Sequence, residues 1–163
     1  MRNYTEKDLE TFIEDYLRDN NSITSLSSEY KANKSLYNVD RCVLSNEFIN
    51  FIKITQEENW DKFCGQYSIN PEERICERLN NQIIKRGLID VLKNGFSDKG
   101  CDFSTLYFKP NSGMNELHKN NYLKNSFKIV RQLYFSPFNS DLSIDLVLFI
   151  NGIPILTIEL KVR

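Results

Sequence analysis

The sequence is poor in the residues that build metal centres and disulfide frameworks. It contains one histidine, His118, and four cysteines with no C-x-x-C pair among them. Structural zinc sites need four cysteine or histidine ligands in characteristic spacings, so the sequence argues against a zinc-binding module. Disulfide frameworks belong to secreted proteins, and since no secretory signal is visible we interpret the four cysteines as reduced thiols.

A long hydrophobic run is also missing. No apolar stretch approaches the roughly 20 residues that span a bilayer. The first twenty residues cannot form the apolar core of a signal peptide because six acids are spread among them: Glu6, Asp8, Glu10, Glu14, Asp15 and Asp19. We therefore expect a cytoplasmic protein that does not contact a membrane.

The third scarcity is net positive charge. The formal net charge is −1, whereas free-standing DNA-binding domains are usually basic, because release of counterions from phosphates supplies most of their non-specific affinity. The cations are unevenly placed, and five of them share one stretch with a single acid, Glu116: Lys109, Lys119, Lys124, Lys128 and Arg131. Two interpretations stay open for that stretch, a phosphate-facing surface and a solvated loop face.

What is present is the composition of one soluble globular domain, with 163 residues of which 40% are hydrophobic. Helical spacing of apolar residues predicts a helix over 5–19, with Thr5 as N-cap and the acids on its outer faces. Pro71 begins a second predicted helix that ends at Gly87. The segment 20–34 is polar and reads as a connector, and the apolar residues of 43–52 fit either a helix or a strand.

The second half of the chain is dominated by strand patterns. Leu88–Leu92 and Phe103–Lys109 both read as strands, and 111–125 reads as a polar loop. Three further strands are predicted, and the Asn151-Gly152 pair between the last two is a strong hairpin signal. These three strands are Phe127–Phe135, Leu142–Ile150 and Ile153–Val162. The pattern predicts an α/β fold whose sheet lies in the C-terminal half.

Three charged residues interrupt the last two strands. Asp145 lies in a strand with apolar residues on both faces, which predicts that the strand is covered on both sides. The same problem recurs in the next strand, where Glu159 and Lys161 share one face. Ionised side chains in such surroundings need partners, so their convergence points to a functional site.

The pairing register decides whether these charges meet. A strict two-residue turn at Asn151-Gly152 places Asp145 opposite Ile158 and leaves Glu159 on the other face. A three-residue loop with a glycine bulge, taking in Ile153, places Asp145 opposite Glu159 instead. The sequence therefore predicts a one-residue irregularity in this hairpin.

Two carboxylates held together favour a cation between them. Mg²⁺ or Mn²⁺ prefers such oxygen ligands, so Asp145 and Glu159 are the candidate metal ligands. With the metal bound, Lys161 would orient the attacking water or offset charge developing on a phosphate, and the chemistry would be phosphodiester hydrolysis. In the alternative interpretation, Glu159 and Lys161 form an exposed pair on an edge strand and Asp145 caps a turn.

The segment from Ser143 to Lys161, with its Asn-Gly turn and Glu-Leu-Lys strand, resembles the N-terminal nuclease domain of the R subunit of type I restriction enzymes. The opening helix from Thr5 to Glu10 is similar as well. The resemblance implies a restriction-endonuclease-like, PD-(D/E)XK fold with a mixed sheet flanked by helices. It also implies cleavage of double-stranded DNA with Mg²⁺ by Asp145, Glu159 and Lys161, supported by an acid of the first helix, Glu10 rather than Glu6.

The sequence departs from this family pattern in two places. Ile144 stands where the family pattern has a proline, and because that proline is often replaced in the family, the assignment stays intact. The family continues into ATP-driven motor domains, whereas this sequence ends at Arg163 and has no G-x-x-x-x-G-K-[ST] loop. We expect residues 1–163 to be a single endonuclease domain truncated before those motors, which alone would use ATP. The implied partners are the methyltransferase and specificity subunits of a restriction-modification complex.

Other residues have less specific interpretations. His118 lies in an Asn-rich segment where no neighbouring residue suggests a nucleophile, so we interpret it as a surface residue. Arg131 and Gln132 would contact DNA, support the site or simply pack. Two other functions remain open for the whole chain: a catalytically inert docking module on the same fold, and a small nucleic-acid-binding domain.

Overall fold

A mixed four-stranded sheet forms the centre of the computed structural model, which describes residues 5–67, 69–110, 116–139 and 141–161. The strand order is β1-β4-β5-β6, with β1 parallel to β4 and the other neighbours antiparallel. The strands are β1 (Ile23–Ser25), β4 (Phe127–Tyr134), β5 (Ser143–Ile150) and β6 (Ile153–Ile158). The α/β prediction and the three C-terminal strands are confirmed, although β6 ends before Glu159.

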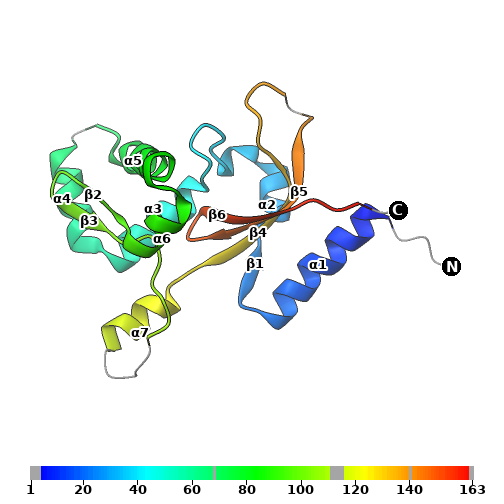
Figure 1. The fold of residues 1–163 in the computed structure, drawn as a ribbon, viewed down its shortest axis with the longest axis horizontal. Helices are drawn as coiled ribbons and strands as arrows, with labels where there is room; N and C mark the ends of the chain where they lie inside the picture. The colour runs from blue at the N-terminus through cyan, green and yellow to red at the C-terminus, as the bar shows by residue number, and fades with distance from the viewer. Residues whose placement is uncertain (1–4, 68, 111–115, 140, 162–163) are drawn as a thin grey trace.

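Helices cover both faces of this sheet (Figure 1). On one side lies α1 (Glu6–Asn20), whose Ile13 and Leu17 pack with Leu146 and other sheet residues. On the other side lie α2 (Ser27–Ala32) and the 3-10 helix η1 (Lys34–Leu36), where Tyr30 packs with Phe149 in a second cluster. Residues 20–34, which we interpreted as a polar connector, therefore contain β1 and α2. Although the segment is mostly polar, its Tyr30 is buried and anchors α2 on the sheet.

A helical lobe packs beside the sheet and holds the largest core cluster (Figure 1). Its centre is made of fully buried aromatic and aliphatic side chains, including Phe48, Phe63, Leu79 and Phe103. The elements are α3 (Ser45–Thr55), α4 (Glu57–Gln66), α5 (Pro71–Arg86), α6 (Leu88–Asn94), and the hairpin of β2 (Phe96–Asp98) and β3 (Cys101–Phe103). The helix predicted from Pro71 is confirmed, 43–52 resolves as a helix, and α4 was not predicted.

The N-terminus of α1 forms as its sequence predicts, but its buried face does not. Thr5 caps the helix, accepting a hydrogen bond from the Asp8 amide at 3.2 Å, while the Asp8 carboxylate accepts one from the Thr5 amide at 2.9 Å. The expectation that acids occupy the outer faces is wrong for Glu10 and Glu14, which are buried. Phe12, expected on the apolar inner stripe, is exposed instead.

Two strand predictions are wrong. Leu88–Leu92 belongs to helix α6, in which only Val91 is buried, because an apolar run of this length fits a short helix as well as a strand. In the segment Phe103–Lys109 only Phe103 lies in a strand, and the residues after it pair with no strand. Side chains satisfy its backbone instead: the Ser104 amide donates to the side-chain oxygen of Gln56 at 2.7 Å, and the Tyr107 amide donates to that of Asn125 at 3.3 Å.

The predicted loop over 111–125 is only partly supported. Residues 116–123 form helix α7 (Glu116–Leu123), which extends from the rest of the molecule in Figure 1. Residues 111–115 lie outside the described part of the chain. No helix in the described ranges is long and apolar enough to cross a membrane.

The Asn151-Gly152 turn is buried where the sheet meets the helical lobe. Both residues have positive φ angles, 49° and 81°, as a tight hairpin turn of this type requires. The Asn151 side chain accepts from the Ser126 amide at 2.8 Å and donates to the Thr105 carbonyl at 3.0 Å. The Gly152 carbonyl accepts from the Leu44 amide at 2.9 Å, so the turn connects the two parts of the fold.

Substituting Gly152→Ala should lower the free energy of unfolding by roughly 2 to 3 kcal/mol. An added Cβ would lie 2.5 Å from the Leu44 carbonyl oxygen, in a backbone conformation that alanine rarely adopts. Gly65→Ala is the matched control, because nothing lies within 4 Å of its Cβ position and it sits in a helix. It should stabilise by up to about 1 kcal/mol. Urea unfolding of both variants checks this, and equal stabilities would contradict the buried turn.

Candidate functional site

The site begins with a one-residue bulge in the hairpin of β5 and β6. Ile150 pairs with Ile153 and Phe149 with Pro154, but Leu148 pairs with Leu156. The predicted irregularity is therefore confirmed, although it lies at Ile155 rather than in the turn, where Ile153 pairs regularly.

The bulge sets which residues lie level at the far end of the hairpin. The register ends at Leu146 opposite Ile158, and its continuation brings Asp145 level with Glu159. The Asp145 Oδ2 atom also accepts a hydrogen bond from the Leu160 amide at 2.6 Å. This bond keeps the end of the chain beside β5 after the regular strand pairing has stopped.

Gln132 meets Asp145 from the opposite side, on strand β4. Its amide nitrogen donates to the Asp145 Oδ1 atom at 3.1 Å and to the Glu10 Oε1 atom at 2.9 Å. Its carbonyl oxygen accepts from the Ser143 hydroxyl at 2.7 Å. Gln132 thus links the acid of β5 to the acid of α1 through one side chain whose hydrogen-bonding groups are engaged at both ends.

Gln132 reaches α1 because the side-chain alternation of β4 is broken there. Its φ angle is +52°, in the left-handed region that non-glycine residues seldom occupy. Arg131 contacts Glu14 of α1, Gln132 contacts Glu10 of α1, and Leu133 packs in the cluster on the opposite side of the sheet. Two successive side chains therefore point to the same helix, which regular strand geometry forbids.

Glu159 and Lys161 lie where the chain leaves the sheet. The pKa of the Glu159 carboxyl is raised above its usual value by desolvation first, then by the charge of Asp145 and a hydrogen bond with its carboxylate. Lys161 is exposed and makes no hydrogen bond or ion pair within the part of the chain that the structure describes. The structure thus brings Asp145, Glu159 and Glu10 into one region and leaves Lys161 beside it.

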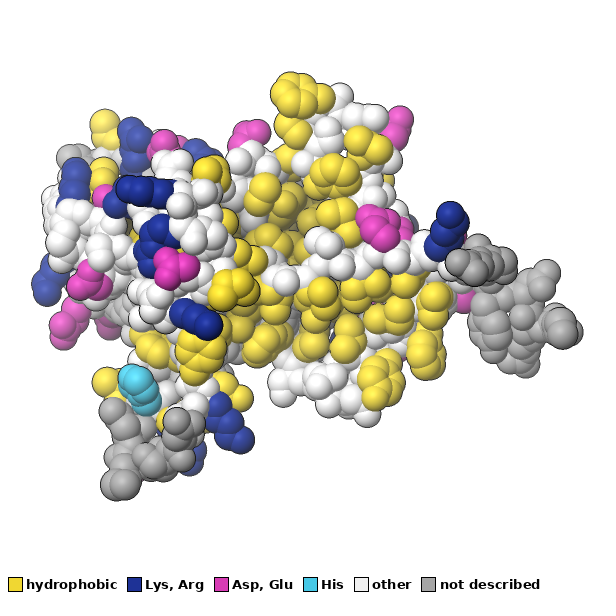
Figure 2. All heavy atoms as spheres, viewed as in Figure 1, with side chains coloured by type: hydrophobic (Ala, Val, Ile, Leu, Met, Phe, Trp, Pro, Cys, Tyr) yellow, Lys and Arg dark blue, Asp and Glu magenta, His cyan; other side chains and the backbone are white. Residues whose placement is uncertain are grey.

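The sequence predicts that both β5 and β6 are buried, and this is correct for β5 only. β5 is buried over residues 146–150, as its apolar pattern predicts. β6 is an edge strand whose Ile155, Leu156 and Thr157 are exposed, so the expectation of burial fails there. Figure 2 shows hydrophobic side chains exposed over this region of the sheet.

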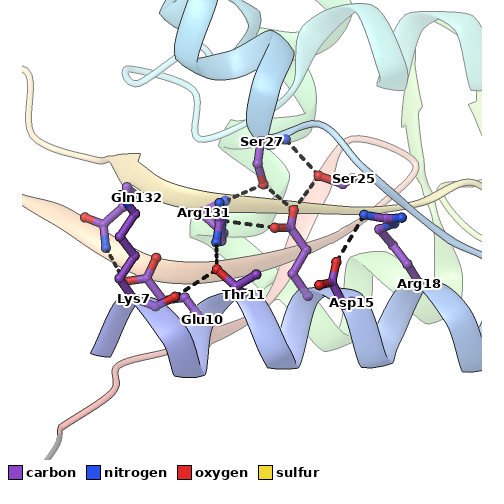
Figure 3. A network of polar contacts seen from close by, with 10 residues as sticks. Lys7, Glu10, Thr11, Asp15, Arg18, Ser25, Ser27, Arg131 and Gln132 are labelled. Atoms are coloured by element: carbon purple, nitrogen blue, oxygen red, sulfur yellow. Dashed lines mark hydrogen bonds and ion pairs between the residues drawn. The ribbon is translucent and has the colours of Figure 1, made fainter. Parts of the chain in front are cut away.

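A buried ion pair fixes α1 against the sheet. The Arg131 Nε atom lies 2.9 Å from a carboxylate oxygen of Glu14, whose side chain is only 7% exposed. Ser27 donates its hydroxyl to the same carboxylate at 2.6 Å, and Ser25 donates there as well (Figure 3). Arg131 also donates to the Thr11 hydroxyl at 2.6 Å (Figure 3). These contacts hold the helix in the position that brings Glu10 to Gln132.

The two candidate ligands fit one side of a magnesium site. The Asp145 charge contributes to the raised pKa of the Glu159 carboxyl, and an oxygen-binding divalent cation would favour the ionised form of Glu159. Among the described residues, no three acidic, histidine or cysteine side chains form a group able to hold a metal by themselves. Mg²⁺ commonly binds through one or two carboxylates and completes its shell with water and phosphate oxygens, so two ligands suffice.

Glu10, rather than Glu6, is the acid of α1 that reaches this region. Glu10 is 6% exposed and bonded to Gln132, whereas Glu6 is exposed in the first turn. Sequence reasoning missed Glu14 and the linking role of Gln132. The four-residue spacing of Glu10 and Glu14 was the available signal, since residues four apart share one face of a helix.

The cation-rich stretch from 109 to 131 does not form one surface. Arg131 is held by Glu14, Lys128 lies 3.8 Å from Glu47, and Lys124 donates to the Ile54 carbonyl at 2.8 Å. His118 is exposed on α7 and its ring packs edge-on near Tyr107, with ring centroids 6.4 Å apart. Lys128 and Arg131 therefore do not support the interpretation of this stretch as a phosphate-facing surface. His118 is a surface residue, as the sequence predicts.

Comparison with known proteins agrees with the family resemblance seen in the hairpin and the first helix. The family model described as the type I restriction enzyme R protein N terminus matches residues 3–163. The chain belongs to this family. No curated protein and no solved structure matches the chain significantly. The match to the R protein N terminus spans nearly the whole chain, so it also includes the region between the first helix and the hairpin, the two segments on which the sequence resemblance rests.

Arg131→Ala should lower the free energy of unfolding of this R protein N-terminal region by about 3 kcal/mol, because it leaves the Glu14 carboxylate buried without its cation. Arg18→Ala is the control: Arg18 pairs with Asp15 at 3.2 Å, but both side chains are about half exposed. Its loss should cost less than about 1 kcal/mol. Chemical denaturation measures both, and similar costs would show that the buried pair does not hold α1.

Proposed function

We propose that the chain is a metal-dependent endonuclease domain with a PD-(D/E)XK fold that hydrolyses phosphodiester bonds in double-stranded DNA. The observation that carries this proposal is the bulge at Ile155, which brings Asp145 level with Glu159 beside Gln132 and Glu10. A purely structural hairpin has no need to place three acids around the end of a sheet, where each ionised carboxylate repels the others. Family membership supports a restriction role.

In this proposal each of the site residues has a separate role in metal binding or catalysis. Asp145 and Glu159 would hold Mg²⁺, or Mn²⁺, through carboxylate oxygens, and Glu10 would support them through Gln132. The bound metal would polarise a phosphate oxygen and favour ionisation of a water molecule. Lys161, exposed beside the acids, would orient that water or offset the charge that develops on the phosphate.

The domain would act within a larger assembly. Type I restriction enzymes imply a restriction-modification complex, and we propose that methyltransferase and specificity subunits are the partners of the parent protein. ATP would be used by motor domains outside residues 1–163. The net charge of −1 supports this arrangement, because a domain with little positive charge gains from having DNA delivered to it.

The alternative is a catalytically inert docking module on the same fold. The exposure of Ile155, Leu156 and Thr157 on the edge strand β6 favours it, because an exposed sheet edge is a ready surface for another chain. In that case Glu159 and Lys161 would form an exposed edge pair, and only the hydrogen bonds of Asp145 to Gln132 and Leu160 would matter for structure.

Plasmid cleavage by the parent subunit, assembled with its partners in Mg²⁺ and ATP, separates the two. Asp145→Asn and Lys161→Ala should each reduce cleavage by roughly 100-fold or more, because each removes a group acting on the reacting phosphate. Asp141→Asn and Lys93→Ala are matched controls at exposed positions and should cleave normally.

ATP hydrolysis should be retained by all four variants, which shows that assembly is intact. Undiminished cleavage by both Asp145→Asn and Lys161→Ala would contradict the nuclease assignment and favour the docking module. Calorimetric titration of the chain with Mn²⁺ gives a readout apart from activity. Asp145→Asn should weaken Mn²⁺ binding, whereas Asp141→Asn should leave it unchanged.

A further inference from the structure

A cavity of about 520 Å³ lies between α1, the α2 and η1 segment, and the end of β4. Its volume is in the range of pockets that enclose small ligands, roughly 300 to 1,000 Å³. The wall is formed by ten residues, of which four are cationic and one is acidic. The cations are Lys7, Lys31, Lys34 and Arg131, and the acid is Glu10.

Three of these cations are available for a ligand. Arg131 is held by Glu14, so the charge offered by the cavity comes from Lys7, Lys31 and Lys34, which are all exposed. The ammonium group of Lys34 lies 3.3 Å from the centre of the Tyr134 ring, a cation–π contact that holds it at the cavity wall. We refer to this cavity as the lysine pocket. It is locally positive although the whole chain is slightly negative.

The lysine pocket is continuous with the candidate metal site. Glu10 and Gln132 belong to its wall, and the same Gln132 amide that bonds Glu10 also bonds Asp145 (Figure 3 shows Gln132 with Glu10). A polymer with one phosphate at Asp145 and Glu159 would therefore extend into the pocket with neighbouring phosphates. A repeating anion is the ligand that fits several lysines gathered at a pocket beside a phosphodiester-cleaving site.

We propose that the lysine pocket binds the sugar-phosphate backbone of the DNA strand that is cut, at phosphates next to the scissile bond. This inference rests on the proposed nuclease function and adds the residues that position the substrate, Lys7, Lys31 and Lys34. They act as point charges on phosphate oxygens, so they contribute affinity without sequence preference.

The test is fluorescence anisotropy of a labelled DNA duplex with the full chain, in EDTA so that nothing is cleaved, over a series of salt concentrations. The double variant Lys31→Ala/Lys34→Ala should bind more weakly, and its salt dependence should fall by roughly one unit of slope for each lysine. Lys34→Arg keeps the charge and should retain most of the affinity. The control pair Lys62→Ala/Lys93→Ala removes two exposed lysines of the helical lobe and should bind as the wild type does.

Several outcomes overturn the proposal: no measurable binding by the wild type at low salt, an unchanged slope in the Lys31/Lys34 variant, or an equal loss in the control pair. Competition distinguishes the source of the phosphate, since unlabelled duplex should displace the probe far better than a deoxynucleoside monophosphate or inorganic phosphate at equal phosphate concentration. Equal displacement would identify a free-phosphate pocket and contradict the strand assignment.

Failure of this proposal is separable from failure of the nuclease function. If the nuclease assignment is wrong and the pocket is right, Asp145→Asn leaves plasmid cleavage intact while the Lys31/Lys34 variant still loses duplex binding. If the pocket is wrong and the nuclease is right, the Lys31/Lys34 variant binds and cleaves as the wild type does, while Asp145→Asn abolishes cleavage.

Discussion

The arrangement of the whole candidate site depends on one extra residue in an edge strand. Side chains of paired strands keep a strict two-residue alternation, so a regular hairpin would hold Asp145 level with Ile158. The bulge at Ile155 shifts the pairing by one and brings Glu159 to that level. Its position is physically reasonable: β6 is at the sheet edge, and Pro154, which lacks an amide donor, precedes the bulge. A central strand would lose ladder bonds on both sides.

The second constraint is the buried acid on α1. Glu14 is stable inside the protein only because Arg131 and two serine hydroxyls surround it. Those contacts fix the rotation of the helix, and Glu10, one turn earlier, is carried onto Gln132 by the same rotation. The exposure of Phe12 follows from this choice, since a helix that buries its acids must present part of its apolar stripe to solvent. The packing of α1 on the sheet thus produces both the Glu14–Arg131 ion pair and the contact of Glu10 with Gln132.

Sequence reasoning succeeded where short-range rules decide the outcome. The cap at Thr5 and the Asn151-Gly152 turn depend on neighbours within a few positions, and the one-residue irregularity follows from counting residues along one hairpin. It failed where distant side chains take over. Phe103–Lys109 alternates like a strand, yet Gln56 and Asn125 occupy its backbone, and Glu14 is an acid on an amphipathic helix that finds a cation far along the chain. The spacing of apolar residues along the sequence does not reveal partners that come from distant parts of the chain.

Charge gives the clearest case of this difference between local pattern and spatial arrangement. The cation-rich run from 109 to 131 is conspicuous along the sequence, but Lys128 lies near Glu47 and Arg131 is held by Glu14. Lys31 and Lys34 of the lysine pocket are near each other in the sequence, but only the fold brings Lys7 of the first helix to them. Arg131, which pairs with the buried Glu14 carboxylate, cannot also neutralise a phosphate without leaving that carboxylate without its cation. The capacity of a chain with net charge −1 to face DNA is therefore set by which cations the fold leaves without an acidic partner, and among the described residues Lys7, Lys31 and Lys34 at the lysine pocket are three of them.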